Sequence, residues 1–412
     1  MPRIRFAPHE GGEGGYLVRS AAMGFRSDVE LGIGDNTGQD SQEIVMCTSL
    51  VYRDAAGRAY FGRTLELTVD LPYRIAWFPA GFAMDSRIAD HPPVRFTTRY
   101  GVLAITMPAR IPTQDDPIGP ADLKVLEGLN DQGLTFSLLS YPTAAGAEAP
   151  IPSQTAVLSA SDLGLWALGQ FRTVADVKAA LATQPVMLEA LAMLGGVVSP
   201  FHYLVNDATG ASFVIEFHQG EMSVYDNPVR VLTNGPRFDW HLTNLDNYTF
   251  LSNVDRPTAT FGDYLAAQPD SGIATSGLPA SNTSVGRFVR AAFYAQYTEK
   301  ADTPDRAVTT LAHVMNNFDR PRGVTIDLPE AGISHLEVKG LDAPGGGAAT
   351  EFTCWTSLSD LDRKLFFLRA YDTCNYTRFD LSALIGADKP LALPFQRFSG
   401  DTVDGTAMLK AA

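Results

Sequence analysis

The chain has 412 residues, of which 45% are hydrophobic and 19% charged. This is enough apolar material for a large core, which excludes a disordered or fibrous protein. The formal net charge is −14 and no run is rich in lysine and arginine, so the sequence offers no basic surface for nucleic acid. No stretch approaches the roughly 20 apolar residues of a membrane-spanning helix. We therefore expect neither a nucleic-acid partner nor a membrane span.

The first 46 residues differ from the rest of the chain. They are rich in glycine and charge, as in 11–15 and 32–36, and they lack the apolar core of an export signal. We expect a flexible leader or a wrongly assigned start at residues 1–46, followed by a single domain over residues 47–412. The sequence indicates a cytoplasmic protein, with a periplasmic or secreted location as the alternative.

Ordered structure is predicted from Cys47 onward. Alternating apolar residues predict strands over 47–53 and 59–67, which form a hairpin around the turn 54–57. Further strands are expected at 74–79, 97–107, 133–141, 201–205, 212–217, 222–225, 229–233, 352–357 and 364–371. Helices are expected after Thr173, ending before Pro185, and at 238–250, 286–297 and 303–318. This order predicts layers of helix packed on antiparallel sheet.

Residue spacing excludes several common sites. The seven histidines show no H-x-x-x-H pair and no C-x-x-C partner, so we expect no metal site. The glycines at 32–34 lack the spacing of a dinucleotide-binding turn, no G-x-S-x-G motif occurs, and we expect no cofactor. Cys354 and Cys374 are interpreted as small buried side chains in strand-like sequence, with a disulfide across a hairpin left open as the alternative.

Cys47 is the remaining candidate for chemistry. A lone cysteine is usually a small buried residue, but Cys47 opens the first predicted strand, and Arg63 and Glu66 lie on its hairpin partner. Adjacent antiparallel strands can bring this cation and this anion beside the thiol. A cation beside a cysteine favours the reactive thiolate.

Four short sequence motifs occur along the chain, and the first of them begins at Cys47. They are Cys47-Thr48, Gly62-Arg63, Thr233-Asn234-Gly235-Pro236 with the adjoining Phe238-Asp239-Trp240 and Leu242-Thr243-Asn244-Leu245, and Arg287-Phe288-Val289-Arg290. Together they resemble the choloylglycine hydrolase family, which contains bile salt hydrolases and penicillin V acylases of the N-terminal-nucleophile hydrolase superfamily. The resemblance extends from Cys47 to about Leu381. It implies an α+β fold, a four-layer αββα sandwich of two antiparallel sheets flanked by helices.

The resemblance also implies a nucleophile that carries its own base. Cys47 must become the first residue, because only a free α-amine, with a pKa of about 7.7–8.0, can accept the thiol proton. Arg63 then favours the thiolate and Glu66 orients the α-ammonium, although the family normally carries aspartate at the position of Glu66. Arg287 resembles a second active-site arginine, with an exposed charge at a helix start as the alternative. Residues 1–46 are then absent from the active enzyme.

The resemblance further implies an oxyanion hole, formed by the Asn234 side chain and the backbone N–H of Ser140. Family members carry Asn or Tyr where this chain has Ser140, which changes the side chain that contacts the substrate. Asp239 and Asn244 are expected to hold the helix that follows Asn234.

The expected substrate is a small-molecule amide with an apolar acyl group, such as a conjugated bile salt or penicillin V. Trp77, Phe82 and Tyr141 are expected to bind the acyl group, and Leu67, Tyr73 and Ile75 are further apolar candidates for it, with ordinary core positions as the alternative for each. An acylase of N-acyl homoserine lactones or other fatty amides is a second interpretation, because the catalytic set would be the same. A third is a catalytically silent binding protein of the same fold. The resemblance also implies a homo-oligomer, a tetramer.

Overall fold

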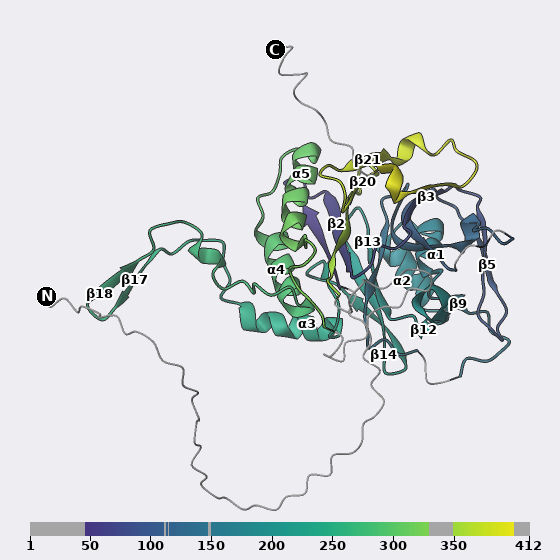
Figure 1. Ribbon diagram of the computed structural model, residues 1–412, viewed down its shortest axis with the longest axis horizontal. Helices are drawn as coiled ribbons and strands as arrows, with labels where there is room; N and C mark the ends of the chain where they lie inside the picture. Colours follow the sequence, from purple (N-terminus) through teal and green to yellow (C-terminus); the bar gives the residue numbers. More distant parts are fainter. Residues whose placement is uncertain (1–45, 111–112, 114, 147–149, 329–348, 399–412) are drawn as a thin grey trace, which may run out of the picture. The chain divides into compact units, whose positions relative to one another are not determined.

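Two large antiparallel sheets form the centre of the fold (Figure 1). The structure is a computed structural model that describes residues 46–110, 113, 115–146, 150–328 and 349–398. All of these belong to one unit, Asp40–Ala412. The expected leader, apart from its last residue, lies outside the described residues.

Sheet A contains, in spatial order, β16 (Val231–Leu232), β1 (Met46–Arg53), β2 (Ala59–Leu67), β19 (Phe352–Asp360), β20 (Leu365–Ala370) and β21 (Thr377–Asp380). Sheet B contains β15 (Glu221–Asp226), β14 (Ser212–His218), β13 (Phe201–Asn206), β8 (Thr135–Ser140), β7 (Leu123–Asn130), β6 (Val102–Pro108), β3 (Arg74–Phe78) and β22 (Leu391–Pro394). Every neighbouring pair in both sheets is antiparallel.

Helices cover the outer face of each sheet. α4 (Ser284–Tyr297) and α5 (Pro304–Met315) pack on sheet A, whereas α1 (Leu163–Gln170), followed by α2 (Val174–Leu181), packs on sheet B. The inner faces meet, and β1 contacts β8 across the interface. The chain is therefore an α+β protein with the four-layer αββα sandwich that the sequence predicts.

Shorter elements connect these layers. They are α3 (Phe238–Leu245) and the strand pairs β4 (Ala83–Ser86) with β5 (Val94–Thr97), β9 (Leu158–Ser159) with β10 (Val186–Met187), β11 (Ala190–Leu191) with β12 (Val197–Val198), and β17 (Thr258–Phe261) with β18 (Tyr264–Ala267). Single 3₁₀ turns occur at Pro120–Asp122, Ala192–Leu194, Asp246–Tyr248, Ile273–Thr275, Asn316–Phe318, Leu381–Ala383 and Phe395–Phe398.

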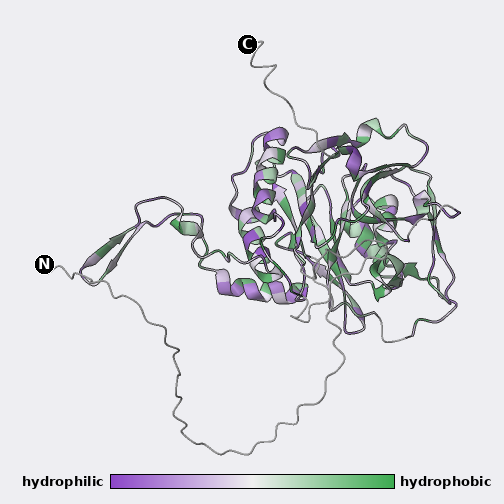
Figure 2. Cartoon of the chain, viewed as in Figure 1, coloured by the Kyte–Doolittle hydropathy of each residue, from purple (hydrophilic) through white to green (hydrophobic). Residues whose placement is uncertain are grey.

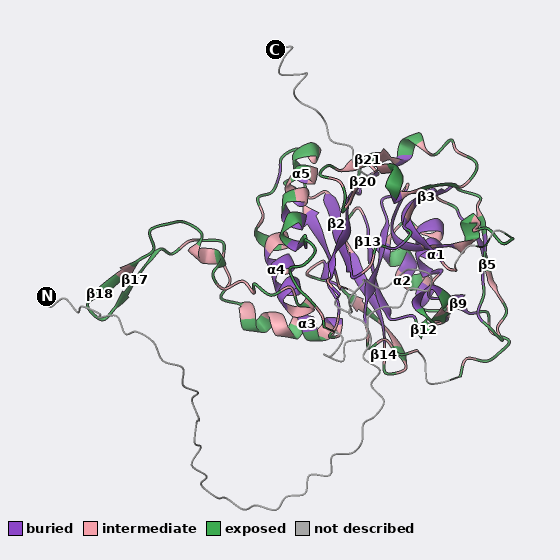
Figure 3. Ribbon diagram, viewed as in Figure 1, coloured by how far each residue is buried: buried purple, intermediate pink, exposed green. Residues whose placement is uncertain are grey.

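Burial follows from this layering. All nine residues of β2 are buried, because one face of sheet A meets sheet B and the other meets the helices. Figure 3 shows the strands of both sheets as the most buried part of the fold, and Figure 2 shows hydrophilic residues on α3, α4 and α5. The polar residues Arg63 and Glu66 are thus buried within β2, where a charge needs a partner.

The closest approach of α5 to β2 is at Gly62. A Cβ atom at this position would lie 2.8 Å from both Cγ and Sδ of Met315, and 3.0 Å from Cδ1 of Leu311. Glycine is required here by the packing of a helix on a strand, and its backbone adopts no left-handed conformation.

Several predicted elements need correction. The strand expected at 97–107 is two strands, because the chain turns between Thr98 and Gly101. The helix expected at 238–250 ends at Leu245 and continues only as a 3₁₀ turn. Helix α1 has no counterpart in the predictions, because seven of its eight residues are buried and its sequence lacks a polar stripe. The three cysteines are free, and Cys374 is exposed, so no hairpin disulfide forms.

Candidate active site

Cys47 is the second residue of β1 and is fully buried. On one side, β2 places Leu65 directly opposite Cys47. On the other side, β1 pairs with β16, which ends at Leu232. The chain that leaves β16 therefore passes the start of β1, and this sheet edge brings Asn234 to Cys47.

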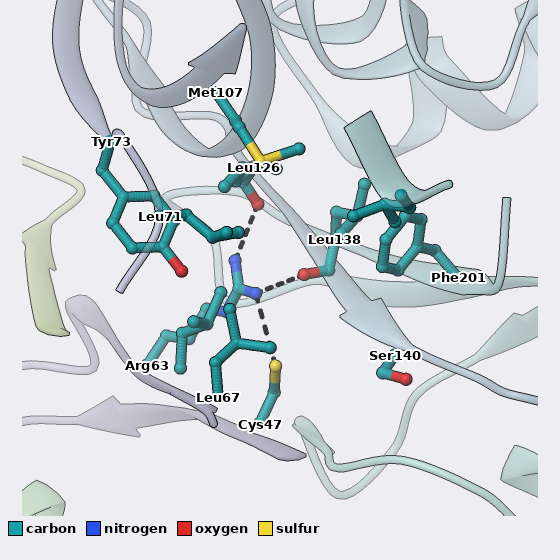
Figure 4. Close-up of a pocket in the computed structure, with 12 residues that line it drawn as sticks. Cys47, Arg63, Leu67, Leu71, Tyr73, Met107, Leu126, Leu138, Ser140 and Phe201 are labelled. Carbon is teal, nitrogen blue, oxygen red and sulfur yellow. Dashed lines mark hydrogen bonds between the residues drawn. The ribbon is translucent and has the colours of Figure 1, made fainter. Parts of the chain in front are cut away.

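Arg63 lies on the same face of β2 as Leu65 and reaches the thiol. The Nη2 atom of Arg63 is 3.6 Å from Cys47 Sγ. The guanidinium also donates to the backbone carbonyl oxygen of Leu126, at 2.7 Å, and to that of Leu138 (Figure 4). These bonds hold a buried cation beside the sulfur atom.

Burial raises the pKa of the Cys47 thiol above its usual value. Arg63 and the backbone N–H of Ser140 lower this pKa, but the effect of burial is larger. With Met46 still attached, the thiol is therefore protonated near neutral pH. It needs a base before it can act as a nucleophile.

The Asn234 side-chain amide is joined to the start of β1. Its Oδ1 accepts the backbone N–H of Cys47 at 2.9 Å and a hydrogen bond from Arg287 at 2.7 Å. Its Nδ2 donates to the backbone carbonyl of Ser140 at 2.9 Å. This bond uses one of the two N–H groups of the amide.

Arg287 is fully buried in the first turn of α4, a helix capped by the Thr283 hydroxyl, which accepts the N–H of Gly286. It donates to the backbone carbonyl oxygen of Cys47 and, at 2.8 Å, to Thr48 Oγ1. The guanidinium thus ties the helix to the start of β1, which excludes the alternative of an exposed charge at the helix start.

Glu66 lies on the other face of β2, opposite Met46 in the register of the two strands. Its Oε1 accepts a hydrogen bond from Thr353 Oγ1 at 3.1 Å, and its buried Oε2 has no hydrogen-bond partner among the described residues. Burial raises the pKa of Glu66 to about 7, and Arg287 opposes this effect. In this structure the backbone N–H of Cys47 bonds to another acceptor and not to Glu66.

The buried ion pair of Arg320 and Glu351 lies near Glu66. Arg320 NH1 is 2.8 Å from Glu351 Oε2 and 3.7 Å from Met46 Sδ. Burial raises the pKa of Glu351 to about 7, with Arg320 opposing the rise. Sequence reasoning missed this pair, because the two residues are far from the motifs in sequence and only the fold brings them to Met46.

A pocket that is partly open to solvent lies beside Cys47 and Arg63. Its other lining residues are Leu65, Leu67, Leu71, Tyr73, Met107, Leu126, Leu138, Ser140, Leu194 and Phe201. Figure 4 shows aliphatic side chains grouped around the guanidinium and the thiol. Leu67 and Tyr73 are two of the apolar candidates that the sequence offers for the acyl group, whereas most of the other lining residues come from parts of both sheets that match no local motif.

Three of the aromatic residues expected to bind the acyl group, Trp77, Phe82 and Tyr141, do not line this pocket. Trp77 lines a separate hollow with Arg74 and Leu391. Phe82 packs on the ring of Phe78, with the ring centroids 5.4 Å apart. The chain has left the Cys47 pocket by the time it enters β3 at Arg74, so neither residue lines that pocket.

Tyr141 also lies outside the pocket. Its ring stacks on His202, with centroids 5.1 Å apart and planes 12° apart. Its hydroxyl group is 2.8 Å from Nδ1 of His218. Tyr141 therefore packs against His202 and His218. None of the three aromatic residues lines the pocket.

Residues 47–335 match the model of a family described as linear amide C–N hydrolases, choloylglycine hydrolase family. The chain belongs to this family. A bile salt hydrolase/transferase of Clostridium perfringens is 26% identical to it over 340 residues, which are 82% of this chain and 93% of that protein. A conjugated bile acid hydrolase of Lactobacillus acidophilus is 30% identical over 249 residues, 60% of this chain and 74% of that one.

Solved structures share the fold of this chain. A mutant of the conjugated bile acid hydrolase of Clostridium perfringens superimposes with a TM-score of 0.69 at 23% identity, covering 87% of this chain and 99% of the other. The penicillin V acylase of Agrobacterium tumefaciens gives a TM-score of 0.63 at 22% identity, covering 85% and 91%. At these identities the likeness shows the fold alone.

Among the residues that the structure describes, no helix is both long and apolar enough to cross a membrane. The same residues contain no group of three or more His, Cys, Asp or Glu side chains that could hold a metal ion.

Proposed function

We propose that this choloylglycine hydrolase cleaves linear amide C–N bonds with Cys47 as an N-terminal nucleophile, acting on conjugated bile salts or penicillin V-like N-acyl amides. One observation carries the proposal: the Cys47 thiol faces both the Arg63 cation and an apolar pocket, while its backbone N–H is held by Asn234. The family match supports it, because it begins at Cys47.

The proposed reaction starts with the free α-amine of Cys47, which takes the thiol proton that burial otherwise retains. The thiolate attacks the amide carbonyl carbon, and the negative charge on its oxygen is held by the second N–H of the Asn234 amide and the Ser140 backbone N–H. The α-ammonium returns its proton to the departing amine. Water, activated by the same α-amine, then cleaves the thioester.

The charged residues on the helix side have a place in this scheme. Glu66 Oε2 is buried and has no hydrogen-bond partner within the described part of the chain, and Glu66 lies opposite Met46 in the strand register. Removal of Met46 creates an ammonium group at this end of β1, where Glu66 can accept from it. Arg287 keeps Asn234 and the Cys47 carbonyl group in place.

Two routes can make Cys47 the first residue. Translation can start at Met46, after which the methionine is removed, or a longer segment can be cleaved off autocatalytically. Either route leaves residues 47–412 as the amide hydrolase.

The test compares the full chain, a chain that starts at Met46, and a full chain whose residue before Cys47 cannot be removed, Met46→Pro. Intact mass gives the N-terminal residue, and release of amine from glycine- and taurine-conjugated bile salts and penicillin V gives the activity. We expect hydrolysis only from molecules that start at Cys47. Full activity with residues 1–46 attached would refute the proposal, and no activity from any molecule starting at Cys47 would favour a silent binding protein.

A second candidate substrate class is favoured by the pocket lining. Six of the residues around Cys47, Leu65, Leu67, Leu71, Leu126, Leu138 and Leu194, are leucines, and flexible aliphatic walls fit an acyl chain as well as a ring. N-acyl homoserine lactones and other fatty amides are therefore assayed beside the bile salts. If rates follow the amine group and ignore the acyl group, the acyl assignment of the pocket is wrong.

We also propose that the chain forms a homo-oligomer, a tetramer by family resemblance. The β17–β18 hairpin supports an interface, because Phe261, Tyr264 and Leu265 are 70%, 69% and 63% exposed. Light scattering on Phe261→Ser with Tyr264→Ser should show a smaller particle than the wild type. A wild-type monomer would refute the proposal.

A further inference from the structure

We propose that His202 and His241 are positioning residues that fix the loop Thr233–Pro236 and thereby the oxyanion donor Asn234. The inference rests on the proposed function of Asn234. Both histidines are fully buried, and neither lines the Cys47 pocket. They act through the backbone of the loop.

His202, on β13, holds the carbonyl group that precedes Asn234. Its Nε2 is 3.0 Å from the oxygen of Thr233, which can only accept, so Nε2 carries a hydrogen and donates it. Its Nδ1 is 3.0 Å from Glu216 Oε1. The Glu216 oxygens also accept the backbone N–H of Phe238, at 3.0 and 3.1 Å. The ring is therefore oriented by a carboxylate that is itself fixed.

His241, on α3, holds the carbonyl group of Asn234 itself. Its Nε2 is 2.9 Å from that oxygen. Burial lowers the pKa of His241 to about 4, so the ring is neutral near pH 7 and carries its hydrogen on Nε2. Nδ1 has no partner among the described residues, and the ring stacks on Phe288 with centroids 4.5 Å apart.

A third hydrogen bond to the backbone of this loop comes from α4. The backbone N–H of Asn234 donates to Ser284 Oγ at 2.9 Å, in the first turn of α4. The oxygen before the Asn234 Cα, its own N–H and its own oxygen are thus held by β13, α4 and α3. Because each peptide group is planar, these three bonds fix the backbone on both sides of the Asn234 Cα.

The three hydrogen bonds that fix the loop backbone have a consequence for catalysis. An oxyanion donor is effective because it is in place before charge develops, and a displacement of about 1 Å can cost about a hundredfold in rate. The Asn234 side chain has its own bonds to Cys47, Arg287 and Ser140, but its starting point is set by the loop. Loss of one histidine anchor should therefore lower kcat more than it raises KM.

The test uses His241→Phe, which keeps a ring on Phe288 and removes the donor, and His241→Gln, which restores an N–H. Trp240→Phe, at the neighbouring and 44% exposed position of α3, is the matched control. For the amide that the wild type hydrolyses fastest, we expect His241→Phe to lower kcat about tenfold to a hundredfold with little change in KM. His241→Gln should recover most of this loss, and Trp240→Phe should match the wild type.

Hydrogen exchange measured by mass spectrometry over residues 231–238 provides a readout that needs no turnover. His241→Phe should exchange faster in this segment alone. An unchanged kcat in a folded His241→Phe variant, or unchanged exchange, would overturn the inference. If that variant does not fold, Ser284→Ala removes another anchor with a smaller change and should show the same two effects. A wild type that hydrolyses no amide would refute the proposed function, whereas exchange still decides whether His241 fixes the loop.

Discussion

The two faces of the β1–β2 pair carry opposite chemistry. The inner face presents Cys47, Arg63 and Leu65 to an aliphatic pocket between the sheets. The outer face presents Met46 and Glu66 to the helices, where two arginines and a second carboxylate gather. Strand alternation therefore sends the thiol toward the acyl group and the residue before it toward the charges.

The difference teaches how one buried strand pair can serve a nucleophile and its base. On the inner face, the Arg63 cation donates to two backbone carbonyl oxygens and pairs with the buried carboxylate of Glu127 at 3.4 Å, and Glu127 does not line the pocket. On the outer face, carboxylates and guanidinium groups compensate one another, as buried charges must. A new α-ammonium would form at the boundary between the two environments.

Replacement of Cys47 gives the largest expected effect, because it removes the meeting point of the two faces. Cys47→Ser should lose nearly all turnover while folding normally, since an alkoxide is harder to form than a thiolate with so weak a base. Circular dichroism and amide-hydrolysis rates measure the two properties. Cys374→Ser, at an exposed thiol that does not line the pocket, is the control and should remain active. Wild-type rates in Cys47→Ser would remove this residue from the mechanism.

Asn234→Ala should lower kcat by roughly 10²–10³-fold with little change in KM, because its N–H acts mainly in the transition state. Steady-state kinetics measure this split. Asn247→Ala, an exposed amide beyond α3 that bonds only to Asn244, should behave as the wild type. A change confined to KM would make Asn234 a substrate-binding residue instead.

Glu66→Gln tests the outer face through the pH dependence of stability. The pKa of Glu66 is about 7 in the folded chain against an ordinary value of 4.5, so the folded state retains a proton that the unfolded state releases. The wild type should therefore lose unfolding free energy as pH rises from about 4.5 to about 7, on the order of 2 kcal/mol. Glu66→Gln should lack this loss in denaturant titrations at pH 5 and pH 8. Parallel curves would show that Glu66 does not hold the proton.

Leu71→Phe tests the inner face and has the smallest expected effect. A larger side chain in the pocket should lower kcat/KM for the longest acyl groups by about tenfold relative to short ones. Leu391→Phe, which lines the separate hollow beside Trp77, should leave the acyl preference unchanged. The reverse result would return the acyl group to Trp77.

The sequence predicted the fold and the residues around Cys47 better than it predicted the pocket. The hairpin of 47–53 and 59–67 has a strong local pattern, and its register alone brings Arg63 and Glu66 to the start of β1. Asn234 and Arg287 were found through motifs, and the structure brings both to Cys47.

The pocket could not be predicted in the same way. Its residues come from β1, β2, β6, β7, β8 and β13 and from the connections before β3 and β13, which meet only when the sheets stack. Trp77 and Phe82 follow the catalytic strands closely in sequence, but β3 carries them away. His202 and His241 match no spacing rule, because they hold backbone atoms of a loop and bind neither metal nor thiol.

Gly62 connects the spacing of the layers to the chemistry of the next residue. Because a Cβ at this position would lie 2.8 Å from side-chain atoms of Met315, a larger residue must displace that side chain, α5 or β2. Arg63 would shift with β2, although its guanidinium is tied to carbonyl groups of sheet B. Gly62 thus sets the spacing between β2 and α5, and this spacing determines how far the Arg63 side chain reaches toward the thiol. Variation at position 62 should therefore be read as variation in the active site, even though Gly62 touches neither the thiol nor the pocket.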